Sequence, residues 1–76
     1  MPYYRVTIRG EPARGAGLLA KAGIQNVVHL DDAPRTLTAR LSAANGESAV
    51  QRVRSALEGE PFTVEAYAHL EHGAAG

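Results

Sequence analysis

Two kinds of hydrophobic periodicity take turns along this 76-residue chain, and their order constrains the fold more than any single motif. Apolar residues at every second position indicate half-buried strands, and apolar residues at every third or fourth position indicate helices. The patterns follow in the order strand, helix, strand, strand, helix, strand. The predicted strands cover residues 3–9, 26–31, 35–42 and 62–70, and the predicted helices cover residues 12–22 and 47–58.

This order of segments predicts an α+β fold of the ferredoxin-like βαββαβ type, a two-layer sandwich with a four-stranded antiparallel sheet. Because crossover connections are right-handed, the first and third strands are expected in the centre, which gives the sheet order 4-1-3-2. Each predicted helix has one apolar stripe, so both helices should cover one face of the sheet and leave the other face open. We expect a single domain over residues 1–72 and a flexible tail over residues 73–76.

The alternation within each strand predicts which side chains face the helices and which face the open side. In the last strand it assigns five residues to the helix side: Phe62, Val64, Ala66, Ala68 and Leu70. The open face then receives the remaining residues of the four strands: Arg5, Thr7, Arg9, His29, Thr36, Thr38, Arg40, Thr63, Glu65, Tyr67 and His69. On this face we expect a cross-strand ion pair between Arg5 and Glu65.

The composition implies a small core that would gain from a partner. The chain has no cysteine and therefore no disulfide, and its apolar residues include fourteen alanines but a single phenylalanine. Eight basic and eight acidic residues cancel, which argues against non-specific binding to nucleic-acid phosphates. No signal sequence or membrane-length apolar run is visible, so we expect a cytoplasmic protein without membrane contact.

The glycine-rich stretch EPARGAGLLAKAG allows two interpretations. In the first, the segment Gly10–Gly17 is a loop at a helix N-terminus that holds an anion, with Arg14 and Arg9 adding charge-assisted hydrogen bonds. In the second, Gly15 and Gly17 belong to a short helix and let it pack close to the sheet. Pro12, which suits the first turn of a helix, is compatible with both interpretations.

The order of elements and the run RGEPARG resemble acylphosphatases, small enzymes of this topology whose first loop binds phosphate and carries an essential arginine. The resemblance implies a small hydrolase with Arg14 as the phosphate ligand. The chain lacks the fuller glycine–glutamine–glycine loop of that family. It also has His29 to Asp32 where the catalytic asparagine of the family is expected. The hydrolase therefore stands as a second alternative.

The arginine-bearing sheet face offers a first alternative, the binding of nucleic acid or another anion. Arg5, Arg9 and Arg40 form the expected basic patch on this face, and Tyr3 and Tyr67 flank it. Proteins that bind single-stranded nucleic acid combine such charges with aromatic rings on which the bases stack. The full set of residues for this alternative also includes the glycine-rich segment: Arg5, Arg9, Arg14, Arg40, Gly15 and Gly17.

Neither a metal site nor a bound cofactor is expected. The chain has three histidines, His29, His69 and His72, and the last two are three residues apart, which on a strand places them on opposite faces. No cysteine supports them as a ligand, and no serine lies in a nucleophile elbow.

The favoured interpretation is a non-catalytic module that binds a protein, either a second copy of itself or an unknown host protein. The last strand is expected at the sheet edge, long, regular and free of proline, and such an edge invites pairing with another strand. We predict an interface formed by Thr63, Glu65, Tyr67 and His69, through the edge itself or through the open face. Small size and composition also fit a phage or accessory-gene product.

Overall fold

A computed structural model describes residues 2–24, 26–29 and 34–70. The described residues form the predicted succession of strands and helices, and the boundaries agree with the prediction to within two residues wherever they can be compared. The elements are β1 (Tyr3–Arg9), α1 (Pro12–Lys21), β2 (Asn26–His29), β3 (Thr36–Ser42), α2 (Gly46–Ala56) and β4 (Thr63–Leu70). The end predicted for the second strand and the tail predicted for residues 73–76 lie outside the described residues.

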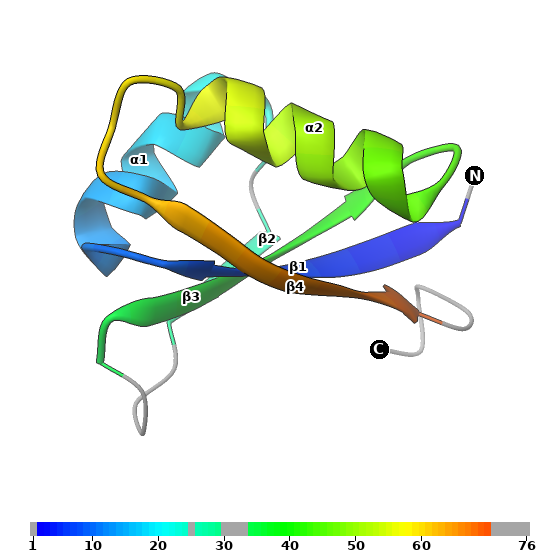
Figure 1. Ribbon diagram of the computed structural model, residues 1–76, viewed down its shortest axis with the longest axis horizontal. Helices are drawn as coiled ribbons and strands as arrows, with labels where there is room; N and C mark the ends of the chain where they lie inside the picture. Colours follow the sequence, from blue (N-terminus) through cyan, green and yellow to red (C-terminus); the bar gives the residue numbers. More distant parts are fainter. Residues whose placement is uncertain (1, 25, 30–33, 71–76) are drawn as a thin grey trace.

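The four strands form one antiparallel sheet with the order β2-β3-β1-β4, which is the predicted order read from the opposite edge. Figure 1 shows both helices on the same side of this sheet, while the other side carries no helix. Strand β1 lies in the centre and pairs with β3 and with β4. The protein is therefore an α+β fold with an open, four-stranded antiparallel sheet.

Local signals in the sequence set the ends of both helices. Helix α1 begins with Pro12, and the Glu11 side chain accepts a hydrogen bond from the Ala13 N–H at 3.3 Å. It ends before Gly23, whose φ of 84° lies in the left-handed region that glycine tolerates. Helix α2 is capped by Asn45, which accepts a hydrogen bond from the Ser48 N–H at 2.8 Å. In the described ranges, no helix has the length and apolarity needed to cross a membrane.

The core lies between the sheet and the two helices, and it uses the alternation that the sequence predicts for β1 and β3. Tyr4, Val6 and Ile8 of β1 are buried, and each faces a buried residue of β3 in the register: Leu41, Ala39 and Leu37, respectively. The helices contribute further buried side chains: Leu19, Ala49, Val53 and Leu57. No polar or charged side chain is buried in the described part of the chain.

A β-bulge in β4 changes the faces that alternation predicts for the C-terminal half of the strand. Ile8 lies opposite Val64, but the next residue of β1, Thr7, lies opposite Ala66, so Glu65 has no partner of its own. An extra residue in one strand shifts all following side chains to the other face. Tyr67 consequently lies opposite buried Val6 and is on the helix side.

Five face assignments in this strand are thus wrong. Tyr67 and His69, predicted on the open face, lie on the helix side, opposite the buried residues Val6 and Tyr4. Ala66 and Ala68, predicted on the helix side, lie opposite Thr7 and Arg5 on the open face. Leu70, also predicted on the helix side, lies opposite Tyr3 and is likewise on the open face. The predicted face of the His29 side chain lies outside what the structure describes.

Candidate functional site

Strand β4 is one of the two edge strands of the described sheet, and it is longer than the other, β2. Among the described residues, β4 has a single neighbour, β1, and Figure 1 shows its other side open. The bulge at Glu65 divides the strand into a short first part and the regular segment 66–70. We call this regular segment the β4 edge segment. It contains no proline and no acidic, lysine or arginine side chain.

The structure does not bring the four predicted interface residues onto one face. Thr63 lies opposite Arg9, and Glu65 forms an ion pair with the same arginine, so both belong to the open side. Tyr67 and His69 follow the bulge and belong to the helix side. The four residues share an edge, and a partner strand at that edge would meet them on two different faces.

Three aromatic rings line the helix side of the β4 edge segment. The Tyr4 ring lies 6.2 Å from the Tyr67 ring, centroid to centroid, at an interplanar angle of 64°, and 5.3 Å from the His69 ring at 51°. Tyr4 is buried beneath, but 54% of Tyr67 remains exposed to solvent. Edge-to-face contacts of this kind favour a fixed ring position, so the exposed Tyr67 is held in place from below.

Gly46 supports Tyr67 from the first turn of α2. A Cβ at position 46 would overlap the Tyr67 ring, so the absence of a side chain there lets the ring lie against the helix backbone. The sequence analysis missed this contact, because it placed Gly46 in the turn before the second helix and Tyr67 on the open face. The one available signal was the position of a glycine, Gly46, directly after the residue that caps the helix, Asn45.

The ion pair predicted for Glu65 involves a different arginine. The Arg9 Nε lies 3.2 Å from the Glu65 Oε2, whereas Arg5 lies opposite Ala68 in the register. The register explains this, because Glu65 lies between the partners of Thr7 and Ile8 and is therefore nearer to Arg9 than to Arg5 along β1. The ion pair engages one of the three arginines of the predicted basic patch.

The other two arginines of the patch are direct neighbours on the central strands. Arg5 of β1 lies opposite Arg40 of β3, and Asn26 of β2 lies opposite Arg40 from the other side. Two like charges opposite each other on one face of a sheet destabilise it. Of the two tyrosines predicted to flank the patch, Tyr3 lies on this face, whereas Tyr67 lies on the helix side.

The glycine-rich segment is a helix start rather than a loop. The helix begins at Pro12, so Gly15 and Gly17 are helical, and the carboxylate of Glu11 already occupies the helix N-terminus. The Gly10 N–H donates to the carbonyl of Arg35 at 2.8 Å. Two of the amides that an anion could use in this segment, those of Ala13 and Gly10, are thus engaged by the protein itself.

The two helical glycines differ in their surroundings. A Cβ at Gly15 would lie 2.9 Å from the Phe62 ring and 3.2 Å from a methyl group of Leu37, so this glycine lets α1 pack close to the sheet. A Cβ at Gly17 would meet nothing within 4 Å. The packing interpretation therefore holds for Gly15, and the structure gives no reason for Gly17.

Arg14, the predicted phosphate ligand, forms an ion pair within the chain. Its Nε donates to the Glu60 Oε1 over 2.7 Å, which links α1 to the segment before β4. The hydrogen bond and the charge of Glu60 raise the pKa of Arg14. The hydrogen bond from Arg14 lowers the pKa of Glu60, although desolvation acts in the opposite direction. Arg14, which the acylphosphatase resemblance implies as a phosphate ligand, is therefore paired with a carboxylate of its own chain.

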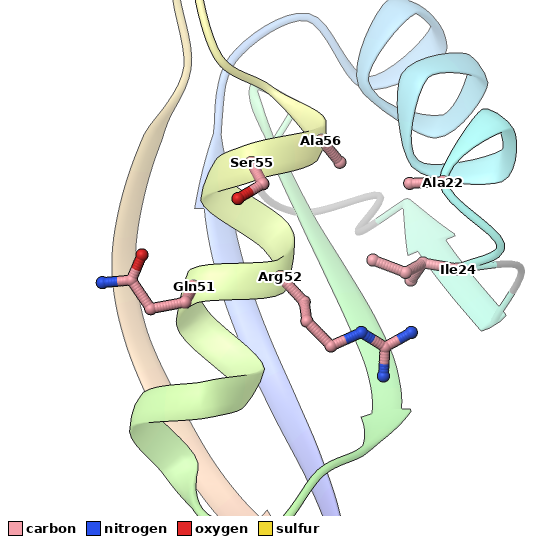
Figure 2. A pocket seen from close by; sticks show the side chains of 6 residues that line it. All are labelled: Ala22, Ile24, Gln51, Arg52, Ser55 and Ala56. Carbon is pink, nitrogen blue, oxygen red and sulfur yellow. The ribbon is translucent and has the colours of Figure 1, made fainter.

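A shallow hollow of about 400 Å³ lies between the end of α1 and α2 (Figure 2). Ala22 and Ile24 point toward α2, and Ala56 points back toward them. Arg52 reaches along the same side, and its Nη1 donates to the carbonyl of Ser42 at 2.9 Å. Half of the lining side chains are small and one is charged, and that charged side chain, Arg52, is hydrogen-bonded to the backbone of β3.

Comparisons with known proteins do not add a family to this description. No protein-family model, curated protein or solved structure matches the chain. Within the described ranges, no group of three or more histidine, aspartate or glutamate side chains is placed to hold a metal ion. His72 lies outside these ranges.

Proposed function

We propose that this chain is a small ferredoxin-like binding module that associates with a second copy of itself through the outer edge of β4. The observation that carries the proposal is that β4 has a single strand neighbour among the described residues, and that its regular segment, which includes the exposed Tyr67, has no lysine, arginine or acidic residue. Edge strands act as templates for another strand unless charges, prolines, bulges or covering elements blunt them.

The features of β4 that hinder pairing with another strand lie in its first half. The bulge at Glu65 twists the backbone there, and the ion pair of Glu65 with Arg9 places charges beside it. Beyond Glu65 the ladder with β1 is regular again up to Leu70. A partner strand would therefore add to the second half of β4.

The edge is better suited to self-association than the open face. On the open face, Arg5 lies opposite Arg40 in the centre of the sheet. A second copy placed face to face would add two more arginines to this row, and like-charge contacts of this kind cost affinity. The β4 edge segment 66–70 has no lysine, arginine or acidic residue, so two copies can approach there without such repulsion.

The small core supplies a thermodynamic reason for association. The fully buried large side chains are Ile8, Leu19, Leu37, Val6 and Val53, and β4 contributes none of them. A chain of this size buries a smaller share of its surface than a larger domain does. Contacts across an added strand would cover Tyr67 and enlarge the buried apolar surface.

The solution mass of purified chains tests this function. Sedimentation equilibrium of the unaltered chain should give twice the 8.0 kDa of one copy. His69→Lys places a charge on the edge and should return the mass to that of one chain. Ala20→Lys, at an exposed position of α1, is the matched control and should leave the dimer intact. A mass of one chain for the unaltered protein, or equal effects of both lysines, would contradict the proposal.

A further inference from the structure

We infer that two copies pair their β4 strands antiparallel around a twofold axis at Ala68, an inference that rests on the proposed function. A symmetric antiparallel pair is defined by the residue that faces its own copy. Each choice of that residue fixes every other pair along the two strands. The question is therefore which residue of β4 allows the longest regular ladder.

The bulge and the end of the strand limit the choice. The regular part of β4 runs from Ala66 to Leu70, and Ala68 is its middle residue. An axis at Ala68 pairs this whole segment with the same segment of the second copy. An axis at Tyr67 would place Glu65, the residue without a partner in the β1 ladder, opposite His69. An axis at His69 would extend the ladder beyond the last residue of the strand.

Side-chain sizes on the open face fit the axis at Ala68. In this register Ala68 faces its own copy, and Ala66 faces Leu70 of the second copy. The small side chain thus meets the large one at both ends of the segment, and two small ones meet at the axis. Cross-strand neighbours are about 4.5 to 5.5 Å apart at Cβ, so a small residue opposite a large one avoids crowding.

Ring contacts on the helix side fit the same axis. Tyr67 of one copy would face His69 of the other, and the reverse pair forms on the opposite side of the axis. Both side chains already contact Tyr4 within one chain, at 6.2 and 5.3 Å between ring centroids. The dimer would therefore join the two three-ring groups into one row across the boundary and cover the exposed Tyr67 rings.

Disulfide trapping tests the register, and the chain suits it because it has no cysteine of its own. Directly opposed residues of antiparallel strands have Cα atoms about 4.5 or 5.5 Å apart, which lies within the range that a disulfide spans. Under mild oxidation, Ala68→Cys should give a linked dimer in most of the chains. Ala66→Cys alone should not, because its two copies would be roughly 13 Å apart along the strands.

A mixture of Ala66→Cys and Leu70→Cys chains should form the mixed linked dimer, since these positions face each other in the proposed register. Ala20→Cys, on α1, is the matched remote control and should remain unlinked. Efficient linkage in a mixture of Ala66→Cys and Ala68→Cys, with little linkage of Ala68→Cys alone, would move the axis to Tyr67 and overturn the inference while leaving the proposed function in place. Equal, weak linkage at all positions together with a one-chain mass of the unaltered protein would overturn both.

Discussion

Tyr67 lies directly against the backbone of Gly46, and its ring occupies the space that a Cβ at position 46 would need. This contact joins the β4 edge segment to the first turn of α2. It fixes an exposed ring that two other features also support, the bulge before it and Tyr4 below it. The edge of the sheet thus contacts the helix layer at Gly46.

We expect Gly46→Ala to lower the free energy of unfolding by about 1 to 3 kcal/mol, because the added methyl group must displace the Tyr67 ring. In a Tyr67→Ala background the same substitution should cost much less, since the obstructing ring is gone. Chemical denaturation of the four proteins of this double-mutant cycle measures the coupling. Equal costs of Gly46→Ala in the two backgrounds would show that the two residues do not interact.

The two glycines of α1 should respond oppositely to alanine. Gly15→Ala should destabilise the protein by about 1 to 3 kcal/mol, because its Cβ would press on Phe62 at 2.9 Å. Gly17→Ala should stabilise it by up to about 1 kcal/mol, because the helix gains propensity and the methyl group meets no neighbour. Thermal unfolding of both variants is the measurement. A loss of stability in Gly17→Ala would reveal a role of this residue that packing does not explain.

Deletion of Glu65 should leave the protein folded. Glu65 has no opposite residue in the β1 ladder, so its removal would bring Ala66 next to Val64 and complete a regular strand with Tyr67 still opposite Val6. Deletion of Ala68 is the control, because it would move His69 to the other face and should destabilise the protein strongly. Far-ultraviolet circular dichroism and unfolding curves compare the two. Unfolding of the Glu65 deletion, with a stable Ala68 deletion, would refute the assignment of the bulge.

The pair of Arg14 and Glu60 predicts a specific dependence on pH. Because the hydrogen bond from Arg14 lowers the pKa of Glu60 in the folded state, its contribution to stability is complete above the unfolded value of about 4.3. It is lost as the pH falls through the folded pKa, where the carboxylate takes up a proton. The stability difference between the unaltered protein and Glu60→Gln should therefore shrink from pH 7 to pH 3. A stability difference that grows toward low pH would contradict a lowered pKa of Glu60 in the folded state.

Hydrophobic periodicity was sufficient to predict the elements, their order and the core side of β1 and β3. It was insufficient for β4, because alternation assumes one residue opposite each residue of the neighbouring strand, and the extra residue Glu65 leaves no mark in composition. The small side chains of Ala66 and Ala68 fit either face, so hydrophobicity could not reveal the shift. The glycine-rich segment was ambiguous for a similar reason, because glycine serves both anion loops and close packing.

The most direct test of self-association at the β4 edge is an amide-resolved NMR dilution series of the unaltered chain. We predict that resonances of residues 66–70 shift with concentration, that outward-facing amides there lose hydrogen-exchange protection on dilution, and that the tumbling time falls from that of two chains to that of one. The arginine-bearing open face should remain unchanged. Spectra that do not depend on concentration at the tumbling time of one chain, or shifts centred on Arg5 and Arg40, would contradict the account.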